Sequence, residues 1–336
     1  MIINYRKKCL NFINNIKPIK VRTVGRGISY ANWWGYDDLD KDWFFEFLCS
    51  KWPSHDVFNL RFYSVFRSRK HLKNDGFRKK IFFSGENVES IIEHKNLSID
   101  SKNDKYHFLN QLNKYSDYGL PDVDLAMGYG NIKNDKYLRM PLWILWYFSP
   151  SATYKDVKGV MDELNKSRAL LYRDAVCING HDVFGLRTKI ADDLNSVLDI
   201  AYAGKWRNNT SELWDKYEND KLKYMNLFRF NICPENIDAP HYCTEKIFDS
   251  FRAGCIPIYA GALNNPEPDV INKDAVIFWD LDGDNIDNIK LIKRLKTDEN
   301  FYNKFMQQEK LLPSAAEYVY ERFTKLENKL RELLDD

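Results

Sequence analysis

Polar and charged side chains that could bind an anion cluster around the start of one predicted helix. Tyr242, Glu245 and Lys246 stand at its first residues, and Asn236 lies in the polar, turn-rich stretch before it. The free N–H groups and the dipole of a helix N-terminus favour an anion, and Lys246 adds a full positive charge. This combination suits a diphosphate, with Glu245 able to accept hydrogen bonds from ribose hydroxyls. The alternative is an ordinary helix start whose Glu and Lys are solvated.

The same stretch predicts a loop, a helix and a strand in that order. Thr244 stands where a helix N-cap belongs, and apolar residues follow it at helical spacing. Gly254 ends the predicted helix, and residues 256–259 form a short β-rich run. The charged side chains are therefore expected at the junction between a loop and a helix.

Taken as a whole, residues 235–262 closely resemble the donor-binding motif of the α1,3/4-fucosyltransferases, glycosyltransferase family ten. The positions that fit the motif are Glu235, Asn236, Tyr242, Thr244, Glu245, Lys246, Asp249, Gly254, Pro257 and Tyr259. Two positions depart from it, because Pro234 stands where the family usually has Phe and Ala260 where it usually has Trp. These changes could reshape a pocket wall without removing the charged groups.

Four short motifs in the first half of the chain agree with this resemblance. They are ANWWG at residues 31–35, FFSGEN at 82–87, DLAMGY at 124–129 and YLRMPLW at 137–143. They look like the amino-terminal half of the bacterial members of the family, so the resemblance spans roughly residues 28–310. It implies a GT-B-type α/β fold, with two Rossmann-like, doubly wound domains facing a cleft, and an inverting sugar transfer.

On the acceptor side, Glu86 follows a strand-like run at 80–84 and a glycine, which places a carboxylate at a strand's carboxyl end. Taken alone, this position favours a loop carboxylate or a cap acceptor. The resemblance implies the general base, which takes the proton of the attacking acceptor hydroxyl. Glu89 is the fallback for this role. Trp33 and Trp34 could stack on an acceptor sugar or form a buried pair that fixes a turn.

On the donor side, Arg187 begins a predicted helix after a strand and a glycine-containing loop. It is similar to the family's phosphate-contacting arginine. By the same resemblance, Lys246 would contact the phosphates, Asn236 and Tyr242 the nucleoside, and Glu245 the ribose. A fixed arginine and lysine would stabilise the negative charge of the departing GDP.

Two DxD strings, at residues 122–124 and 280–282, have the pattern of metal-dependent sugar transferases. The first is predicted at a strand edge, and the second borders a turn. Because the resemblance implies a fold without an essential metal, we predict no metal site. We likewise predict no cofactor, with GDP-fucose acting as the donor substrate.

Charge and composition narrow the expected partners. The 50 basic and 48 acidic residues give a net charge of +2, which argues against a nucleic-acid-binding module. The 6 cysteines are scattered without metal-ligand spacing, which favours a reducing compartment. No apolar run reaches membrane-spanning length, and residues 1–20 lack a signal-peptide pattern. We expect a cytoplasmic protein, with weak peripheral membrane contact through its basic N-terminus.

Alternating strand and helix signals predict two α/β domains. The predicted boundaries are a basic extension at 1–26, an acceptor-binding domain at 27–150 with an insertion at 88–119, a donor-binding domain at 151–315, and a C-terminal helix at 316–336. Strands are predicted at 27–33, 57–63, 80–84, 122–127, 175–178, 200–203, 227–233, 256–259 and 275–278. Helices are predicted at 43–52, 187–197, 244–253 and 285–295, with a helical tail divided near Pro313.

The sequence therefore predicts an enzyme that moves L-fucose from GDP-β-L-fucose to a hydroxyl of a GlcNAc-containing glycan, with α1,3 linkage favoured. The predicted partners are the GDP-sugar donor and an oligosaccharide or glycoconjugate acceptor. Two alternatives stay open, namely transfer of another GDP-activated deoxysugar and a non-catalytic glycan-binding protein.

Overall fold

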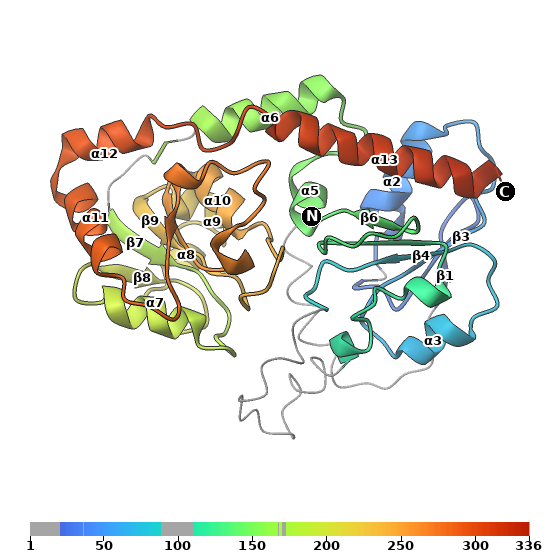
Figure 1. Cartoon of the computed structure of the whole chain (residues 1–336), viewed down its shortest axis with the longest axis horizontal. Helices are drawn as coiled ribbons and strands as arrows, with labels where there is room; N and C mark the ends of the chain where they lie inside the picture. Colours follow the sequence, from blue (N-terminus) through green and yellow to red (C-terminus); the bar gives the residue numbers. More distant parts are fainter. Residues whose placement is uncertain (1–20, 36, 89–110, 167, 170–172, 336) are drawn as a thin grey trace. The chain divides into compact units, whose positions relative to one another are not determined.

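A computed structural model describes residues 21–35, 37–88, 111–166, 168–169 and 173–335. The chain divides into two units (Figure 1). Unit 1 comprises the chain up to Thr153 together with the residues from Tyr320 on, and unit 2 runs from Tyr154 to Val319. Most of the predicted insertion, residues 89–110, and the predicted basic extension up to residue 20 lie outside the described residues.

Unit 1 is built on a six-stranded sheet whose strands follow the order of the chain. Its strands are β1 (Arg22–Thr23), β2 (Ile28–Ala31), β3 (Leu60–Tyr63), β4 (Lys80–Phe83), β5 (Leu125–Gly128) and β6 (Tyr137–Arg139). The short β1 pairs antiparallel with β2, and all later pairs are parallel. The sequential order means that this sheet lacks the reversal of a doubly wound sheet, a feature that local sequence patterns do not encode.

Helices and short turns connect these strands or follow the last of them. They are η1 (Leu39–Lys41), α2 (Trp43–Lys51), α3 (Arg69–Asn74), η2 (Leu120–Asp122) and α5 (Leu142–Tyr147). The Asp42 carboxylate caps α2 by accepting from the Phe44 N–H at 3.0 Å. The apolar face of α2 is buried through Phe44, Phe47 and Leu48, as its spacing predicts.

The long C-terminal helix α13 (Ala315–Asp335) contributes most of its length to unit 1. Phe323 packs edge-on against Trp43 with ring centroids 5.5 Å apart, and Lys51 pairs with Glu327 at 3.0 Å. A helix was predicted here, but nothing in the local pattern indicates that it packs on α2, more than 260 residues earlier.

Unit 2 holds a five-stranded parallel sheet in the order β11-β10-β9-β7-β8. Its strands are β7 (Arg173–Cys177), β8 (Ile200–Tyr202), β9 (Phe228–Ile232), β10 (Ile256–Tyr259) and β11 (Ile277–Phe278). The chain runs outward from β7 to β8 and then returns to place β9 on the other side of β7. The carboxyl ends of β7 and β9 are therefore a topological switch point, where ligands of doubly wound sheets bind.

Helices cover both faces of this sheet, and Figure 1 shows α7 and α10 on different sides of the strands. The helical elements are α6 (Tyr154–Lys166), α7 (Leu186–Leu194), α8 (Glu212–Asp215), α9 (Lys221–Met225), α10 (Lys246–Ala253), η3 (Ala262–Asn264), η4 (Lys273–Ala275), α11 (Ile286–Thr297) and α12 (Glu299–Met306). Alternate residues of β7 serve the two cores, because Ala175 and Cys177 pack with α7, α11 and α12, and Val176 packs with α8, α9 and α10.

The predicted α/β fold class is confirmed in both units, and each predicted strand corresponds to an observed one. The elements that were missed are strands β1 and β6 and helices α3, α5, α6, α8 and α9. The signal for α6 was present, because the buried Val157, Met161 and Leu164 recur at i, i+4 and i+7. At three residues, β6 is too short to show a period. Among the described residues, no helix is both long and apolar enough to span a bilayer.

Lys310 is almost fully buried in unit 2, and its burial should make the folding stability of this unit depend on pH. Its ammonium donates to the Phe251 carbonyl near the end of α10 at 3.2 Å. Burial, assisted by the nearby Arg168 guanidinium, lowers its pKa to about 7. Between pH 7 and the ordinary lysine pKa, the unfolded chain binds a proton that the folded chain does not, so stability rises with pH in this window.

We therefore expect the urea midpoint of unit 2 to increase from pH 7 to pH 9, and Lys310→Met to flatten that increase. The matched control is Lys304→Met on α12, where the lysine is exposed. Equal slopes for the wild type and Lys310→Met would contradict the effect assigned to the buried ammonium.

Candidate functional site

Two of the predicted donor-binding residues meet at the switch point of unit 2. Arg187 lies in the first turn of α7, after β7, and Asn236 lies four residues after β9. The Arg187 guanidinium donates to Asn236 Oδ1 at 2.7 Å and to the His181 carbonyl. Arg187 is buried, so its charge is fixed in place rather than solvated.

The start of α7 is closed by a side chain that the sequence did not single out. Asp182 accepts from the backbone N–H groups of Arg187 at 3.2 Å and Thr188 at 2.7 Å. The residue at the N-cap position, Gly185, has left-handed backbone angles and no side chain to cap with. Asp182 therefore caps the helix, whereas the Arg187 guanidinium is held by Asn236 and the His181 carbonyl.

A buried carboxylate, Glu235, organises the charged cluster at the start of α10. Glu235 is 0% exposed and accepts from the Lys246 ammonium at 2.7 Å. It also accepts from the Thr244 N–H at 2.8 Å, from the Thr244 hydroxyl at 2.8 Å and from the Tyr259 hydroxyl at 3.2 Å. These contacts tie the loop after β9 to the beginning of α10 and to the end of β10.

This geometry corrects the prediction that Thr244 caps α10. The helix begins at Lys246, and the N-cap position belongs to Glu245, whose side chain makes no cap hydrogen bond. Both polar groups of Thr244 face Glu235 instead. A buried carboxylate that follows a buried strand needs such partners. The position of Glu235 after the apolar end of β9 was the sequence signal that could have identified it as an organising residue.

The Lys246 ammonium is charged and largely enclosed. Burial by itself lowers the pKa of Lys246, but the attraction of Glu235 and then Glu245 is stronger and raises it above its ordinary value. The side chain keeps 14% exposure, so the ammonium is not sealed from a ligand. Burial together with nearby acidic groups also raises the Tyr259 pKa, which keeps its hydroxyl a donor to Glu235.

The other predicted donor residues differ in exposure. Asn236 is half-buried, whereas Tyr242 and Glu245 are buried, with 3% and 9% exposure. Pro234 and Ala260, the two departures from the motif, are buried as well, and Ala260 packs in the core beside Trp279. The changes at these positions therefore act on the support of the site rather than on its surface.

Glu86 lies in unit 1, three residues after the end of β4. It is half-buried, and its backbone is fixed because its N–H donates to Ser84 Oγ at 3.2 Å while the Ser84 hydroxyl donates to the Glu86 carbonyl at 3.0 Å. The next residue, Asn87, accepts from the Tyr129 hydroxyl at 2.7 Å. The main chain of Glu86 is thus held at the carboxyl edge of the sheet, as predicted for a residue in this position. Glu89 lies outside the described residues.

The two tryptophans after β2 differ in accessibility. Trp33 is 0% exposed, and its indole N–H donates to Asp42 at 3.0 Å, so the structure assigns it to the core rather than to a sugar-binding surface. Trp34 is half-buried and stacks on Trp33 with centroids 4.0 Å apart. Its edge-on contact with Phe83 at 5.5 Å places it near the end of β4, three residues before Glu86.

Three aspartates of the two DxD strings form hydrogen bonds or an ion pair within the protein. Asp122 pairs with Arg69 at 3.0 Å, and Asp124 accepts from the Lys80 N–H at 2.7 Å. Asp280 accepts from the N–H groups of Asp282 and Gly283 and so closes a turn. Within the described residues, no group of three or more His, Cys, Asp or Glu side chains has the geometry of a metal site.

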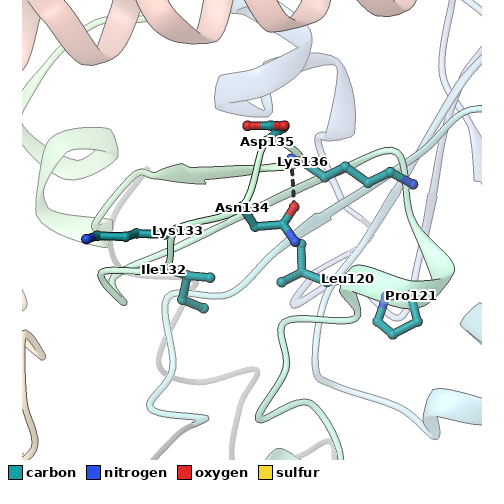
Figure 2. A pocket seen from close by; sticks show the side chains of 7 residues that line it. All are labelled: Leu120, Pro121, Ile132, Lys133, Asn134, Asp135 and Lys136. Carbon is teal, nitrogen blue, oxygen red and sulfur yellow. Dashed lines mark hydrogen bonds between the residues drawn. The ribbon is translucent and has the colours of Figure 1, made fainter.

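A surface cavity of about 1000 Å³ opens elsewhere in unit 1 (Figure 2). Its lining comes from η2 and from the loop before β6, namely Leu120, Pro121, Ile132, Lys133, Asn134, Asp135 and Lys136. These segments precede β5 and β6, so the cavity lies at the amino edge of the parallel sheet, opposite the edge that carries Glu86. It is therefore not part of the predicted site.

Comparison with known proteins gives one family match. Residues 172–329 match the family model described as glycosyltransferase family 10 (fucosyltransferase), C-terminal. The α-(1,3)-fucosyltransferase FucT of Helicobacter pylori is 24% identical over 271 residues, which is 70% of this chain and 50% of the relative. The α-(1,3)-fucosyltransferase B of Drosophila melanogaster is 24% identical over 204 residues, which is 60% of this chain and 43% of the relative. The chain thus spans about half the length of the curated relatives it matches.

Solved structures resemble the fold over nearly the whole chain. A crystal structure of an α1,3-fucosyltransferase aligns with a TM-score of 0.62 and 24% identity, covering 92% of this chain and 90% of that one. A second crystal structure, of an α1,3-fucosyltransferase with GDP-fucose, aligns with a TM-score of 0.58 and 20% identity. The alignment covers 97% of this chain and 96% of that one. At these identities the likeness establishes the fold, which is of the predicted GT-B type.

Proposed function

We propose that the protein is an inverting fucosyltransferase, because residues 172–329 match the family model of glycosyltransferase family 10 (fucosyltransferase). It moves L-fucose from GDP-β-L-fucose to a hydroxyl of a GlcNAc-containing glycan and forms an α1,3 linkage. Unit 2 binds the donor, and unit 1 binds the acceptor and supplies the base.

The observation that carries this proposal is the pair of fixed cations in the matched domain. Arg187 is held at the switch point by Asn236, and Lys246 is held at the start of α10 by Glu235. Fixed cations at a switch point and at a helix N-terminus are suited to a diphosphate. A solved structure with the same fold contains GDP-fucose, which supports GDP-fucose as the donor.

The reaction that these residues support is a single displacement at the anomeric carbon. The acceptor oxygen forms a bond to that carbon while the bond to the phosphate oxygen breaks, and GDP departs with the electron pair. Glu86 takes the acceptor proton as the new bond forms. Arg187 and Lys246 stabilise the charge that develops on the departing diphosphate, and because both are already oriented, little reorganisation is needed.

The direct test is transfer of radiolabelled fucose from GDP-fucose to an array of acceptors that includes N-acetyllactosamine. We expect product with a GlcNAc-containing acceptor, and we expect the rate to persist in excess EDTA, because Arg187 and Lys246 supply the positive charge. Failure of every acceptor would contradict the proposed transferase. Loss of activity in EDTA that Mn²⁺ restores would instead contradict the metal-independent mechanism.

A further inference from the structure

The turn that follows β10 has an unusual backbone for residues that are not glycine. Ala262, Leu263 and Asn264 have φ angles of 53°, 51° and 52°, all in the left-handed region. Such conformations are unfavourable for side chains with a Cβ, and strain of this kind concentrates at functional sites. The contacts around the turn must therefore stabilise these backbone angles.

The turn is held by the same residues that organise the candidate donor site. The Leu263 N–H donates to Asp238 Oδ1 at 2.7 Å, and Asp238 lies on the loop that carries Asn236. A Cβ on Gly261 would lie only 2.7 Å from Glu235 Cγ, so the turn packs directly on the carboxylate that binds Lys246. The Asn264 side chain adds a hydrogen bond to the Trp279 carbonyl at 3.0 Å.

The result of this arrangement is an exposed aliphatic side chain beside a polar, charged site. Leu263 is 61% exposed, whereas its neighbour Ala262 is buried. A strained backbone that presents a leucine to solvent gains nothing in stability from that side chain. An apolar ligand group would explain it, because burying the leucine against that group would recover part of the cost.

Resting on the proposed function, we infer that Leu263 contacts the methyl group of the donor's 6-deoxysugar and so sets donor specificity. GDP-fucose carries phosphates, hydroxyls and a polar base, and the fucose methyl is its single methyl group. The turn lies on Glu235, which holds the cation proposed to bind the diphosphate, and the sugar is attached to that diphosphate. An aliphatic side chain at this position therefore matches the methyl group.

The test compares two donors that differ by this methyl group. GDP-D-arabinopyranose carries a hydrogen where GDP-fucose carries the methyl. A methyl-sized contact in an apolar pocket is worth about 10–200-fold in kcat/KM. We expect the wild-type protein to prefer GDP-fucose, and Leu263→Ala to reduce that preference about tenfold by lowering kcat/KM for GDP-fucose alone.

Leu263→Asn separates the apolar contact from backbone strain, because asparagine tolerates left-handed angles. It should lose the same preference without loss of stability. Affinity for GDP, which lacks the sugar, should not change in either variant. Ile286→Ala, which removes a comparably exposed aliphatic side chain at the start of α11, is the matched control and should keep the preference.

The outcomes distinguish the two proposals. If the wild type transfers no fucose, the proposed function fails. If it transfers fucose and folded Leu263 variants keep the wild-type ratio between the two donors, the specificity role of Leu263 is wrong. A wild-type protein that uses both donors equally well would overturn it too.

Discussion

Glu86→Gln is expected to lower the rate of fucose transfer by about 10²–10⁴-fold, the usual range for a general base. Glutamine keeps the size of the side chain and removes the proton acceptor. The surrounding backbone should not move, because the hydrogen bonds between Ser84 and Glu86 involve only the main chain of Glu86. The measurement is kcat for the transfer, with GDP affinity determined in parallel by titration calorimetry.

GDP affinity should stay within about twofold, since the proposed nucleotide contacts belong to unit 2. The matched control is Glu46→Gln, which neutralises an exposed glutamate on α2 of the same unit and should leave kcat unchanged. A Glu86→Gln protein with wild-type turnover would remove Glu86 from the mechanism and direct attention to Glu89.

The helices and strands of this chain could be predicted well where they are regular and long enough to show a period. Helix α2 buries the three apolar residues at its predicted face, and β9 and β10 lie within the predicted ranges. Strand order could not be predicted, because it depends on which buried edges meet after the strands have formed. The reversal at β7 that places Arg187 beside Asn236 is of this kind.

The candidate site shows a similar division between local and long-range information. The string Thr244, Glu245, Lys246 has the local pattern of a capped helix start. In the structure Thr244 instead donates to Glu235, nine residues earlier, because a fully buried carboxylate is costly without hydrogen-bond donors. The residues around Trp33 were compatible with either a sugar-stacking surface or a core position. In the structure Trp33 is fully buried and its indole N–H donates to Asp42, so it is a core residue.

Lys246→Met is expected to have two separable effects, one on stability and one on GDP binding. Removing the cation leaves Glu235 as a fully buried carboxylate without its ionic partner. Breaking a buried ion pair from one side typically costs about 3–5 kcal/mol of unfolding free energy. The loss of a charged hydrogen bond to the diphosphate should independently weaken GDP binding by about 1.5–3 kcal/mol, which corresponds to roughly 10–150-fold in Kd.

The double variant Glu235→Gln/Lys246→Met separates these two effects. Neutralising both partners removes the uncompensated charge, so most of the lost stability should return. GDP affinity should remain low, because the cation is still missing. Urea unfolding of the wild type, both single variants and the double variant gives the coupling energy of the pair, and calorimetric titration of the same four proteins gives GDP affinity.

An exposed pair provides the control for burial. Lys158 and Asp162 on α6 also lie 2.7 Å apart, but their side chains are 55% and 46% exposed. Lys158→Met should therefore cost less than about 1 kcal/mol and leave GDP affinity unchanged. If the double variant regained GDP affinity together with its stability, the weak binding of Lys246→Met would reflect local unfolding, and Lys246 would not be a phosphate ligand. Retained weak binding in a stable double variant is the result that assigns the ammonium to the diphosphate, with Glu235 as the residue that positions it.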